Sequence, residues 1–311
     1  MSVTTAPARP AVAAASPAVE PARDGWELHE GDLITPDLSV VRLLGGGSAY
    51  EAYLAFDEVT YGPVVVKVLR PGQVEDPVSL RGLRREVEAL GTVNHPVVVR
   101  GLRHQLDGPR PHVVLEQVDG PRLSTLVRRY GPLPEQQYLP LAIEVAGALH
   151  YLRRLGWTHL DIKPANVIMG APARLIDLSV ARPIEAAASL RSVIGTDAYL
   201  APEQADPEGP VSPGPASDVW GLAATVFEAV AGYRPFESGD TEARDVRERW
   251  PQLVQAPRAL PEGVPGEVVE VLAAGLEKDP ARRPLPAEFA EALEPALARQ
   301  PRARFAGFKV R

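Results

Sequence analysis

The chain has 311 residues, including 33 prolines and no cysteine, and it carries a formal net charge of −7. The missing cysteines exclude a disulfide scaffold, a zinc site built on thiolates and a cysteine nucleophile. The acidic balance argues against a nucleic-acid binder, which would be basic, whereas a hydrophobic fraction of 45% suffices for a folded core.

The two ends of the chain differ in composition from the part between them. Residues 1–25 are rich in alanine and proline and cannot bury an apolar face, which predicts a disordered lead-in. Residues 299–311 hold five basic and no acidic residues and predict a basic tail, solvated more often than docked. No stretch offers the ~20 apolar residues of a membrane span, and the N-terminus lacks the apolar core of a secretory signal. We therefore expect a cytoplasmic protein.

The first part of the folded region, about residues 26–118, is rich in predicted strands. Apolar residues at helical spacing over 80–90 predict one amphipathic helix inserted among these strands. The strands themselves are predicted over 40–44, 51–56, 64–69 and 112–118.

The second part, about residues 119–298, is predicted to be mainly helical. Apolar residues at helical spacing over 138–152 indicate a long amphipathic helix, and those over 217–230 lie on most sides of a second helix, which is typical of a buried one. A strand-rich part followed by a helix-rich part predicts an α+β protein of two lobes with a cleft between them.

Three features of the strand-rich part indicate phosphate binding. Gly45, Gly46 and Gly47 lie between two strands, where a hairpin without Cβ atoms lets backbone N–H groups approach phosphate oxygens, although most short glycine runs are plain turns. Lys67 lies inside an apolar strand, where its ammonium either reaches out from an edge or needs a buried partner. Glu86 is on the core-facing side of the predicted helix and can be that partner, which would aim Lys67 at a nucleotide.

One short loop after the long helix carries the groups that phosphoryl transfer needs. Asp161 can orient a hydroxyl and accept its proton, Lys163 can neutralise the moving charge, and Asn166 offers an amide oxygen to Mg²⁺. Asp177 ends an apolar run further along and offers a second oxygen ligand for a hard cation. Singly, each is more often a solvated loop residue or a turn former, but the set in this order favours a catalytic site.

Together these segments resemble the eukaryotic-type (Hanks-type) protein kinases, close to the bacterial Ser/Thr branch, over about residues 33–297. The resemblance implies a bilobal kinase fold, with a small antiparallel-sheet N-lobe (about 26–118) that contains one key helix and a larger, mainly helical C-lobe (about 119–298). It also implies ATP and Mg²⁺ as cofactors. The further segments that agree are Asn94-His95-Pro96, Gly195-Thr196, Ala201-Pro202-Glu203-Gln204, Ser217-Asp218-Val219-Trp220 and Lys278 to Pro284.

Carried over to the matching positions, the resemblance implies a role for each candidate residue. Lys67 would contact the nucleotide phosphates and pair with Glu86. Asp161 would be the catalytic base, and Lys163 would support the γ-phosphate and mark the Ser/Thr form of the loop. The residues that would hold Mg²⁺ are Asn166 and Asp177.

The resemblance also places the nucleotide between the lobes. Leu115 fits the gatekeeper position, so the backbone of Glu116 and Val118 would bond the adenine. Glu203 would pair with Arg283 as a structural strut. The residues implied around the nucleotide are Leu44, Gly45, Gly46, Gly47, Ala52, Val65, Lys67, Leu115, Glu116, Val118 and Ile168.

The chain departs from the family pattern at several positions. Leu160 replaces the arginine that usually binds a phosphate on the activation segment, which here lies between Leu178 and Glu203. We therefore expect activity that does not require phosphorylation of that segment. Ser179 replaces the glycine after the metal-binding aspartate and lacks its access to positive φ, which predicts a less mobile motif. Tyr50 replaces the third loop glycine and would stiffen the loop or cap the cleft. Ala52 and Val65 exchange the valine and alanine that usually face the adenine.

The resemblance implies a serine/threonine protein kinase that transfers the ATP γ-phosphate to hydroxyls of protein substrates. The alternative is a pseudokinase-like nucleotide-binding scaffold or regulator, which the departures favour. A kinase of small molecules is a third hypothesis, and Gly195-Thr196 argues against it because that segment helps to build a peptide-binding shelf. A regulatory protein would be a further partner. The sequence leaves the substrate, the activating signal and the oligomeric state open.

Overall fold

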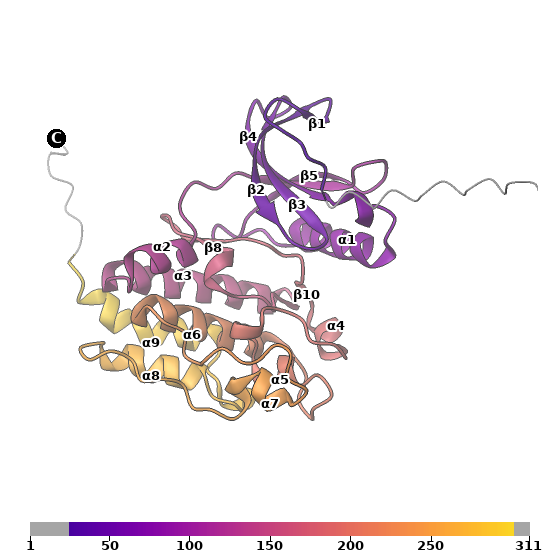
Figure 1. Cartoon of the computed structure of the whole chain (residues 1–311). Coiled ribbons are helices and arrows are strands. Elements are labelled where there is room, and N and C mark those ends of the chain that lie inside the picture. The colour runs from indigo at the N-terminus through magenta and orange to yellow at the C-terminus, as the bar shows by residue number, and fades with distance from the viewer. Residues whose placement is uncertain (1–24, 302–311) are drawn as a thin grey trace, which may run out of the picture.

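The computed structural model describes residues 25–301, so nearly all of the expected lead-in and most of the expected basic tail lie outside the described residues. The described chain forms two lobes (Figure 1). The upper lobe contains a sheet and one large helix, and the lower lobe is a bundle of helices. Within residues 25–301, no helix combines the length and the apolarity that crossing a membrane requires.

The N-lobe is built on one antiparallel sheet of six strands in the order β1-β2-β3-β4-β6-β5. All four strands predicted from the sequence belong to it. The sequence does not predict β1 or β5, because β1 has only three residues and the side chains of β5 are mostly exposed. The strands are β1 (Leu33–Thr35), β2 (Leu38–Gly46), β3 (Tyr50–Asp57), β4 (Gly62–Leu69), β5 (Gly101–Gln105) and β6 (His112–Glu116).

The inserted helix α1 (Pro77–Thr92) follows β4 and packs beneath the sheet (Figure 1). Its start is fixed by Asp76, whose carboxylate accepts a hydrogen bond from the backbone N–H of Ser79 at 2.7 Å. Its buried face carries Leu83, Glu86 and Leu90, so a carboxylate is held inside an apolar interface. Burying that charge requires a partner, and the neighbouring strand β4 provides it.

A second apolar cluster covers the other face of the sheet. Val40, Tyr53, Val66 and Val114 form part of it, and Trp26 packs against it from the segment before β1. The indole N–H of Trp26 donates to the backbone carbonyl of Leu69 at 2.7 Å. The folded N-lobe therefore includes residues ahead of its first strand.

The C-lobe is mainly helical and carries two small antiparallel pairs of strands, β7 with β10 and β8 with β9. The β8–β9 hairpin lies at the boundary between the lobes. It connects the loop that carries Asp161, Lys163 and Asn166, here called the catalytic loop, to the segment that contains Asp177. The helices and strands of the C-lobe are α2 (Leu123–Tyr130), α3 (Glu135–Arg154), β7 (Trp157–Thr158), β8 (Val167–Ile168), β9 (Arg174–Leu175), β10 (Arg182–Pro183), α4 (Ile184–Ala188), α5 (Pro202–Ala205), α6 (Pro215–Ala231), α7 (Val246–Arg249), α8 (Gly266–Gly275) and α9 (Pro286–Ala298).

Helix α6 runs through the centre of the C-lobe. From Ser217 to Ala231 every residue except Glu228 is buried, as the apolar residues on most sides of this helix predict. The helix packs between α3 and α8 and forms one continuous core with them. Asp218 is therefore a carboxylate inside this core, at the level of the catalytic loop.

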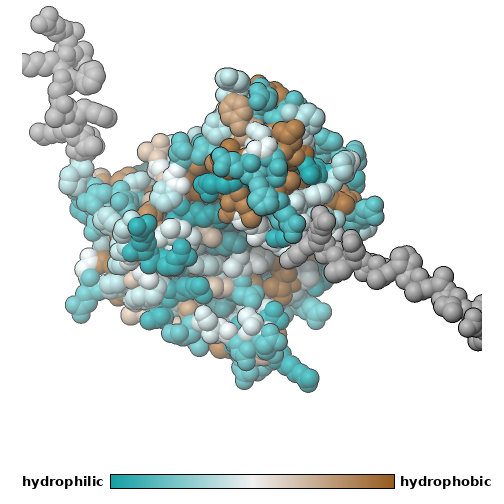
Figure 2. All heavy atoms as spheres, turned by 45° about the horizontal axis from the view of Figure 1, so that its top comes forward, coloured by the Kyte–Doolittle hydropathy of each residue, from teal (hydrophilic) through white to brown (hydrophobic). Residues whose placement is uncertain are grey.

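The surface is mixed rather than dominated by one apolar face. Figure 2 shows hydrophilic atoms over most of the visible side, with hydrophobic atoms gathered on the N-lobe. The exposed large apolar residues of the N-lobe sheet include Leu33, Val41, Leu43 and Leu102.

Candidate active site

Lys67 and Glu86 form a buried ion pair beneath the sheet. The Nζ atom of Lys67 lies 2.6 Å from Oε1 of Glu86, and the two side chains are 6% and 4% exposed. The same ammonium lies 2.9 Å from Oδ1 of Asp177, which comes from the C-lobe. Burial alone would lower the pKa of Lys67, but the charges of Asp177 and Glu86 outweigh it and hold that pKa above its ordinary value. One ammonium thus joins both lobes at the site.

Asp177 is held in its ionised form by this contact. Burial opposes its charge, yet the Lys67 ammonium holds the pKa of the carboxyl well below its usual range. Its φ of 71° lies in the left-handed region, which is uncommon for a residue with a side chain. The backbone N–H of Ser179 donates to Oδ1 at 3.3 Å, and the hydroxyl of Tyr50 donates to Oδ2 at 3.2 Å. Asp177 therefore points into the cleft.

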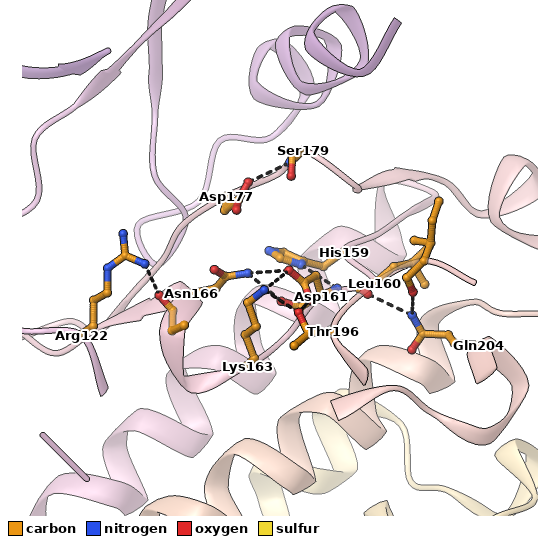
Figure 3. Close-up of polar contacts among 12 residues, drawn as sticks. Arg122, His159, Leu160, Asp161, Lys163, Asn166, Asp177, Ser179, Thr196 and Gln204 are labelled. Carbon is orange, nitrogen blue, oxygen red and sulfur yellow. Dashed lines mark hydrogen bonds and ion pairs between the residues drawn. The ribbon is translucent and has the colours of Figure 1, made fainter. Parts of the chain in front are cut away.

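Three side chains of the catalytic loop, those of Asp161, Lys163 and Asn166, converge with the side chain of Thr196 from the activation segment (Figure 3). Lys163 donates to Oδ2 of Asp161 at 2.7 Å and to the hydroxyl of Thr196 at 2.6 Å. That hydroxyl donates to Oδ1 of Asp161 at 2.8 Å, and the amide of Asn166 donates to Oδ2 at 3.0 Å. Both carboxylate oxygens of Asp161 are thus oriented by neighbours. The structure brings together all three loop residues that the sequence predicts, and it adds Thr196.

The backbone of the loop is anchored from below by Asp218. Its Oδ2 atom accepts from the Thr158 hydroxyl at 2.7 Å and from the His159 N–H at 2.8 Å, while Oδ1 accepts from the Leu160 N–H at 2.7 Å. Leu160 adopts a positive φ of 65°, and this anchoring holds it there. The sequence analysis assigned no role to Asp218, although a carboxylate inside an otherwise apolar helix is a signal that could have revealed one.

A cavity of about 870 Å³ lies between the lobes, within the size range of small-molecule sites. Both lobes line it. Gly47 is the one residue of the predicted nucleotide set that does not line the cavity, and its carbonyl accepts instead from Nε of Arg70 at 2.8 Å. Tyr50 lines the cavity, as one of the two roles expected for it requires, and lining residues that the sequence analysis did not name include Val99, Thr125 and Ile176. The predicted residues on the wall are Leu44, Gly45, Gly46, Ala52, Val65, Lys67, Leu115, Glu116, Val118, Asn166, Ile168 and Asp177.

The segment between the lobes is fixed by Glu116. Its carboxylate pairs with Arg174 on β9, and it also accepts from Nε and Nη2 of Arg100 at 3.2 and 3.1 Å. Arg174 is half-buried, so this pair ties the end of β6 to the C-lobe behind the cavity.

Arg283 and Glu203 form the predicted strut. Two parallel bonds of 2.6 and 2.8 Å join the guanidinium to the carboxylate, and the side chains are 0% and 3% exposed. The Ser217 hydroxyl adds a third bond to Glu203 at 2.7 Å, and the Arg283 guanidinium lies over the ring of Trp220. The strut connects α5, at the end of the activation segment, to the base of α6 and to the segment before α9.

Comparison with known proteins identifies the family. A family model described as "Protein kinase domain" matches residues 38–293. The chain belongs to the protein kinase family. Among curated proteins, this kinase domain is 33% identical over 261 residues to "Serine/threonine-protein kinases drp72" of Corynebacterium efficiens, which covers 81% of the chain and 49% of that protein.

Two further relatives carry similar names. The kinase domain is 33% identical over 250 residues to "Serine/threonine-protein kinase PknB" of Mycobacterium leprae, covering 78% of the chain and 40% of that protein. It is 31% identical over 276 residues to "Serine/threonine-protein kinases PknA" of Corynebacterium glutamicum, covering 86% of the chain and 56% of that protein. The chain thus spans about half the length of the curated relatives it matches.

The departures from the family pattern have clear places in this kinase domain. Leu160 is 3% exposed, and its carbonyl accepts from the side-chain amide of Gln204 at 3.0 Å. The same amide donates to the carbonyl of Ile194 at 3.0 Å. Gln204 therefore links the activation segment to the catalytic loop, a role that the sequence analysis did not assign. Tyr50 lies inside the cleft, and burial raises the pKa of its hydroxyl to about 12.

Proposed function

We propose that this chain is a serine/threonine protein kinase, which uses Mg²⁺ and ATP to phosphorylate hydroxyls of Ser or Thr in proteins. The observation that carries the proposal is the hydrogen-bonded set of Asp161, Lys163 and Thr196. Asn166 connects this set to the cavity, because it donates to Asp161 and lines the cavity together with Lys67 and Asp177. Phosphoryl transfer is catalysed mainly by positioning and by charge stabilisation, and this set provides both.

The residues present fit a metal and a nucleotide. Asn166 and Asp177 supply oxygen donors, as a hard cation prefers, and Mg²⁺ commonly takes only one or two protein carboxylates together with phosphate oxygens. The apolar side chains of Leu44, Val65 and Ile168 line the cavity where a purine would lie. Bound Mg²⁺–ATP would supply the phosphoryl group and charge neutralisation, and Asn166 and Asp177 would hold the metal.

The residues of the loop then divide the work. Asp161 would orient the attacking hydroxyl and accept its proton at one carboxylate oxygen. Lys163, which donates to both Asp161 and Thr196, would carry positive charge beside the transferred group. Thr196 belongs to the activation segment, so its bond to Asp161 makes the position of the base depend on the order of that segment.

We further propose that this order does not require phosphorylation. A phosphate usually holds an activation segment through arginines, whereas here Gln204 bonds Leu160 and Ile194 directly. At Gly195, with a φ of 118°, a Cβ atom would come within 2.9 Å of the Leu160 carbonyl, so segment and loop are in close contact. Neutral hydrogen bonds and packing replace the phosphate link.

Serine-to-alanine substitution tests this second proposal. The combined S189A and S192A variant, and the wild type after phosphatase treatment, should keep their kcat within about threefold, a change below 1 kcal/mol. Loss of activity in either would contradict the proposal. Such a loss would instead indicate that a phosphate on the activation segment binds Arg182, whose buried Nη2 atom has no partner among the described residues.

The main proposal is tested by phosphate transfer from Mg²⁺–ATP to a general protein acceptor. Asp161→Asn and Lys67→Ala should each lower transfer by about 10³-fold or more, because catalytic groups that act as a unit fail together. Glu30→Gln, on the surface ahead of β1, is a matched control and should leave transfer unchanged.

A pseudokinase-like scaffold is the second candidate, and the position of Tyr50 over Lys67 favours it. No transfer by a folded wild type, together with partner binding that survives Asp161→Asn, would support the scaffold and contradict the kinase proposal.

A further inference from the structure

A tyrosine side chain contacts both Lys67 and Asp177, the residues expected to bind the phosphates and the metal. Tyr50 begins β3, directly after the turn of the glycine-rich loop. The centre of its ring lies 4.2 Å from Nζ of Lys67, and its hydroxyl lies 3.2 Å from Oδ2 of Asp177. These are the two residues to which the proposed function gives the phosphates and the metal.

This arrangement engages all three N–H donors of the Lys67 ammonium. An ammonium has three N–H donors. Lys67 directs its contacts to Glu86 at 2.6 Å, to Asp177 at 2.9 Å and to the face of the Tyr50 ring. The negative face of an aromatic ring attracts a cation much as an anion does. The ring therefore takes the side of the ammonium that a phosphate oxygen would need.

Both carboxylate oxygens of Asp177 also accept hydrogen bonds. One of its oxygens accepts from Lys67 and from the backbone N–H of Ser179, and the other accepts from the hydroxyl of Tyr50. A carboxylate that binds a metal gives its lone pairs to the cation instead of to a hydrogen-bond donor. The tyrosine hydroxyl thus engages one oxygen of Asp177, while its ring covers one side of the Lys67 ammonium.

The backbone of the loop holds the tyrosine in place. The N–H of Gly47 donates to the carbonyl of Tyr50 at 3.0 Å, which closes a tight turn. Arg70 clamps this turn from the end of β4: its Nε atom donates to the Gly47 carbonyl at 2.8 Å, and its backbone N–H donates to the Ala49 carbonyl at 3.0 Å. A Cβ atom on Gly46 would come within 2.3 Å of the Tyr50 carbonyl, so glycine is needed at that position.

We propose that Tyr50 is an internal competitor of the metal–nucleotide complex, whose ring and hydroxyl must leave Lys67 and Asp177 before phosphates and metal can bind. This inference rests on the proposed function, because it takes the nucleotide site as given. The apparent affinity of a ligand falls by the fraction of protein in the competent state. Removing the competitor therefore tightens binding of the phosphate-bearing ligand and leaves binding of the bare nucleoside unchanged.

Isothermal titration of three ligands against Tyr50 variants separates the two contacts. The ligands are a non-hydrolysable ATP analogue with Mg²⁺, the same analogue with EDTA, and adenosine. Tyr50→Ala should bind the analogue about tenfold more tightly with or without Mg²⁺, a change of about 1.4 kcal/mol. Tyr50→Phe keeps the ring over Lys67 and loses the hydroxyl, so it should gain about threefold, and only with Mg²⁺.

Adenosine affinity should stay within about twofold in both variants, which corresponds to less than 0.5 kcal/mol. Tyr130→Ala, at a tyrosine that is 67% exposed on α2, is the matched control and should change none of the three affinities. Tyr50→Phe keeps nearly all the packing, so it remains informative where Tyr50→Ala is unstable.

The outcomes separate this inference from the proposed function. Unchanged or weaker binding of the analogue in both variants, with a wild type that transfers phosphate, would overturn the inference alone. An equal gain for adenosine would also overturn it, because the tyrosine would then obstruct the purine. If neither the wild type nor the variants bind any nucleotide, the inference and the proposed function both fail.

Discussion

Replacing Gln204 with methionine tests how the activation segment is held. Methionine has nearly the same length and volume but cannot donate the two bonds of 3.0 Å to the carbonyls of Leu160 and Ile194. Gln204 is 4% exposed, so water cannot easily replace the lost amide. The substitution therefore breaks the link between the segment and the catalytic loop without opening a large cavity.

The size of the effect follows from these two bonds. Each is worth about 1 kcal/mol, and leaving the buried Leu160 carbonyl without a partner adds about 1–3 kcal/mol. The total is about 3–5 kcal/mol in the free energy that holds the segment on the loop. If half of this falls on the arrangement of Thr196 and Asp161, kcat decreases by about 10-fold or more.

The assay is a kcat and KM measurement for Mg²⁺–ATP, accompanied by urea unfolding. Gln204→Met should lower kcat and leave the KM for ATP within about twofold, because no cavity residue changes. Gln252→Met is the matched control: Gln252 is 3% exposed and also donates to two carbonyls, those of Asp197 and Leu200, but not to the catalytic loop. It should lose similar stability and keep kcat. An unchanged kcat in a folded Gln204→Met protein, or an equal loss of kcat in the control, would show that the bonds of Gln204 do not position the catalytic loop.

Three further predictions concern the strut, the N-lobe hairpin and the adenine site. Arg283→Met should lower the free energy of unfolding by about 3–5 kcal/mol in urea titrations, because Glu203 is left as an unpaired buried charge; a loss below 1 kcal/mol would contradict the role of the strut. Asp57 is fully buried, and hydrogen bonds from Arg103 hold its pKa well below the ordinary value. The folded state therefore keeps Asp57 ionised where the unfolded chain takes up a proton near pH 4. Asp57→Asn should have a lower free energy of unfolding than the wild type above pH 5, and this difference between the two proteins should narrow as the pH falls from 5 to 3. A difference that stays constant would contradict the claim that folded Asp57 is ionised. Ala52→Val adds volume to the cavity wall and should weaken adenosine binding about tenfold, since overpacking costs about 1–3 kcal/mol. Unchanged affinity for adenosine in a titration would contradict the prediction that residue 52 contacts the purine.

Much of the site could be predicted because its signals are local. A lysine inside an apolar strand and a glutamate on the buried side of a helix each need a partner, which indicates the Lys67–Glu86 pair. Asp161, Lys163 and Asn166 lie on one loop, so their proximity follows from the sequence alone. The strut between Glu203 and Arg283 spans 80 residues, and only the family resemblance predicted it.

The contacts that the sequence did not predict depend on side-chain direction and on distant packing. Tyr50 and Asp177 are 127 residues apart, and the sequence, which left open whether Tyr50 stiffens the loop or caps the cleft, does not indicate that its hydroxyl bonds Asp177. Gln204 reaches a carbonyl 44 residues away, and any residue can present a carbonyl. The strands β1 and β5 escaped prediction because one is very short and the other has no buried side alternating with an exposed one.

We propose above that Asp161 acts in catalysis and that the activation segment is ordered without phosphorylation. The most direct test is the rate of γ-phosphate transfer from Mg²⁺–ATP to protein serine or threonine by phosphatase-treated wild type and by Asp161→Asn. We expect transfer by the wild type, and a loss of about 10³-fold or more in Asp161→Asn with unchanged affinity for the nucleotide. Equal rates in the two proteins, or a folded wild type that binds nucleotide and transfers nothing, would contradict this expectation.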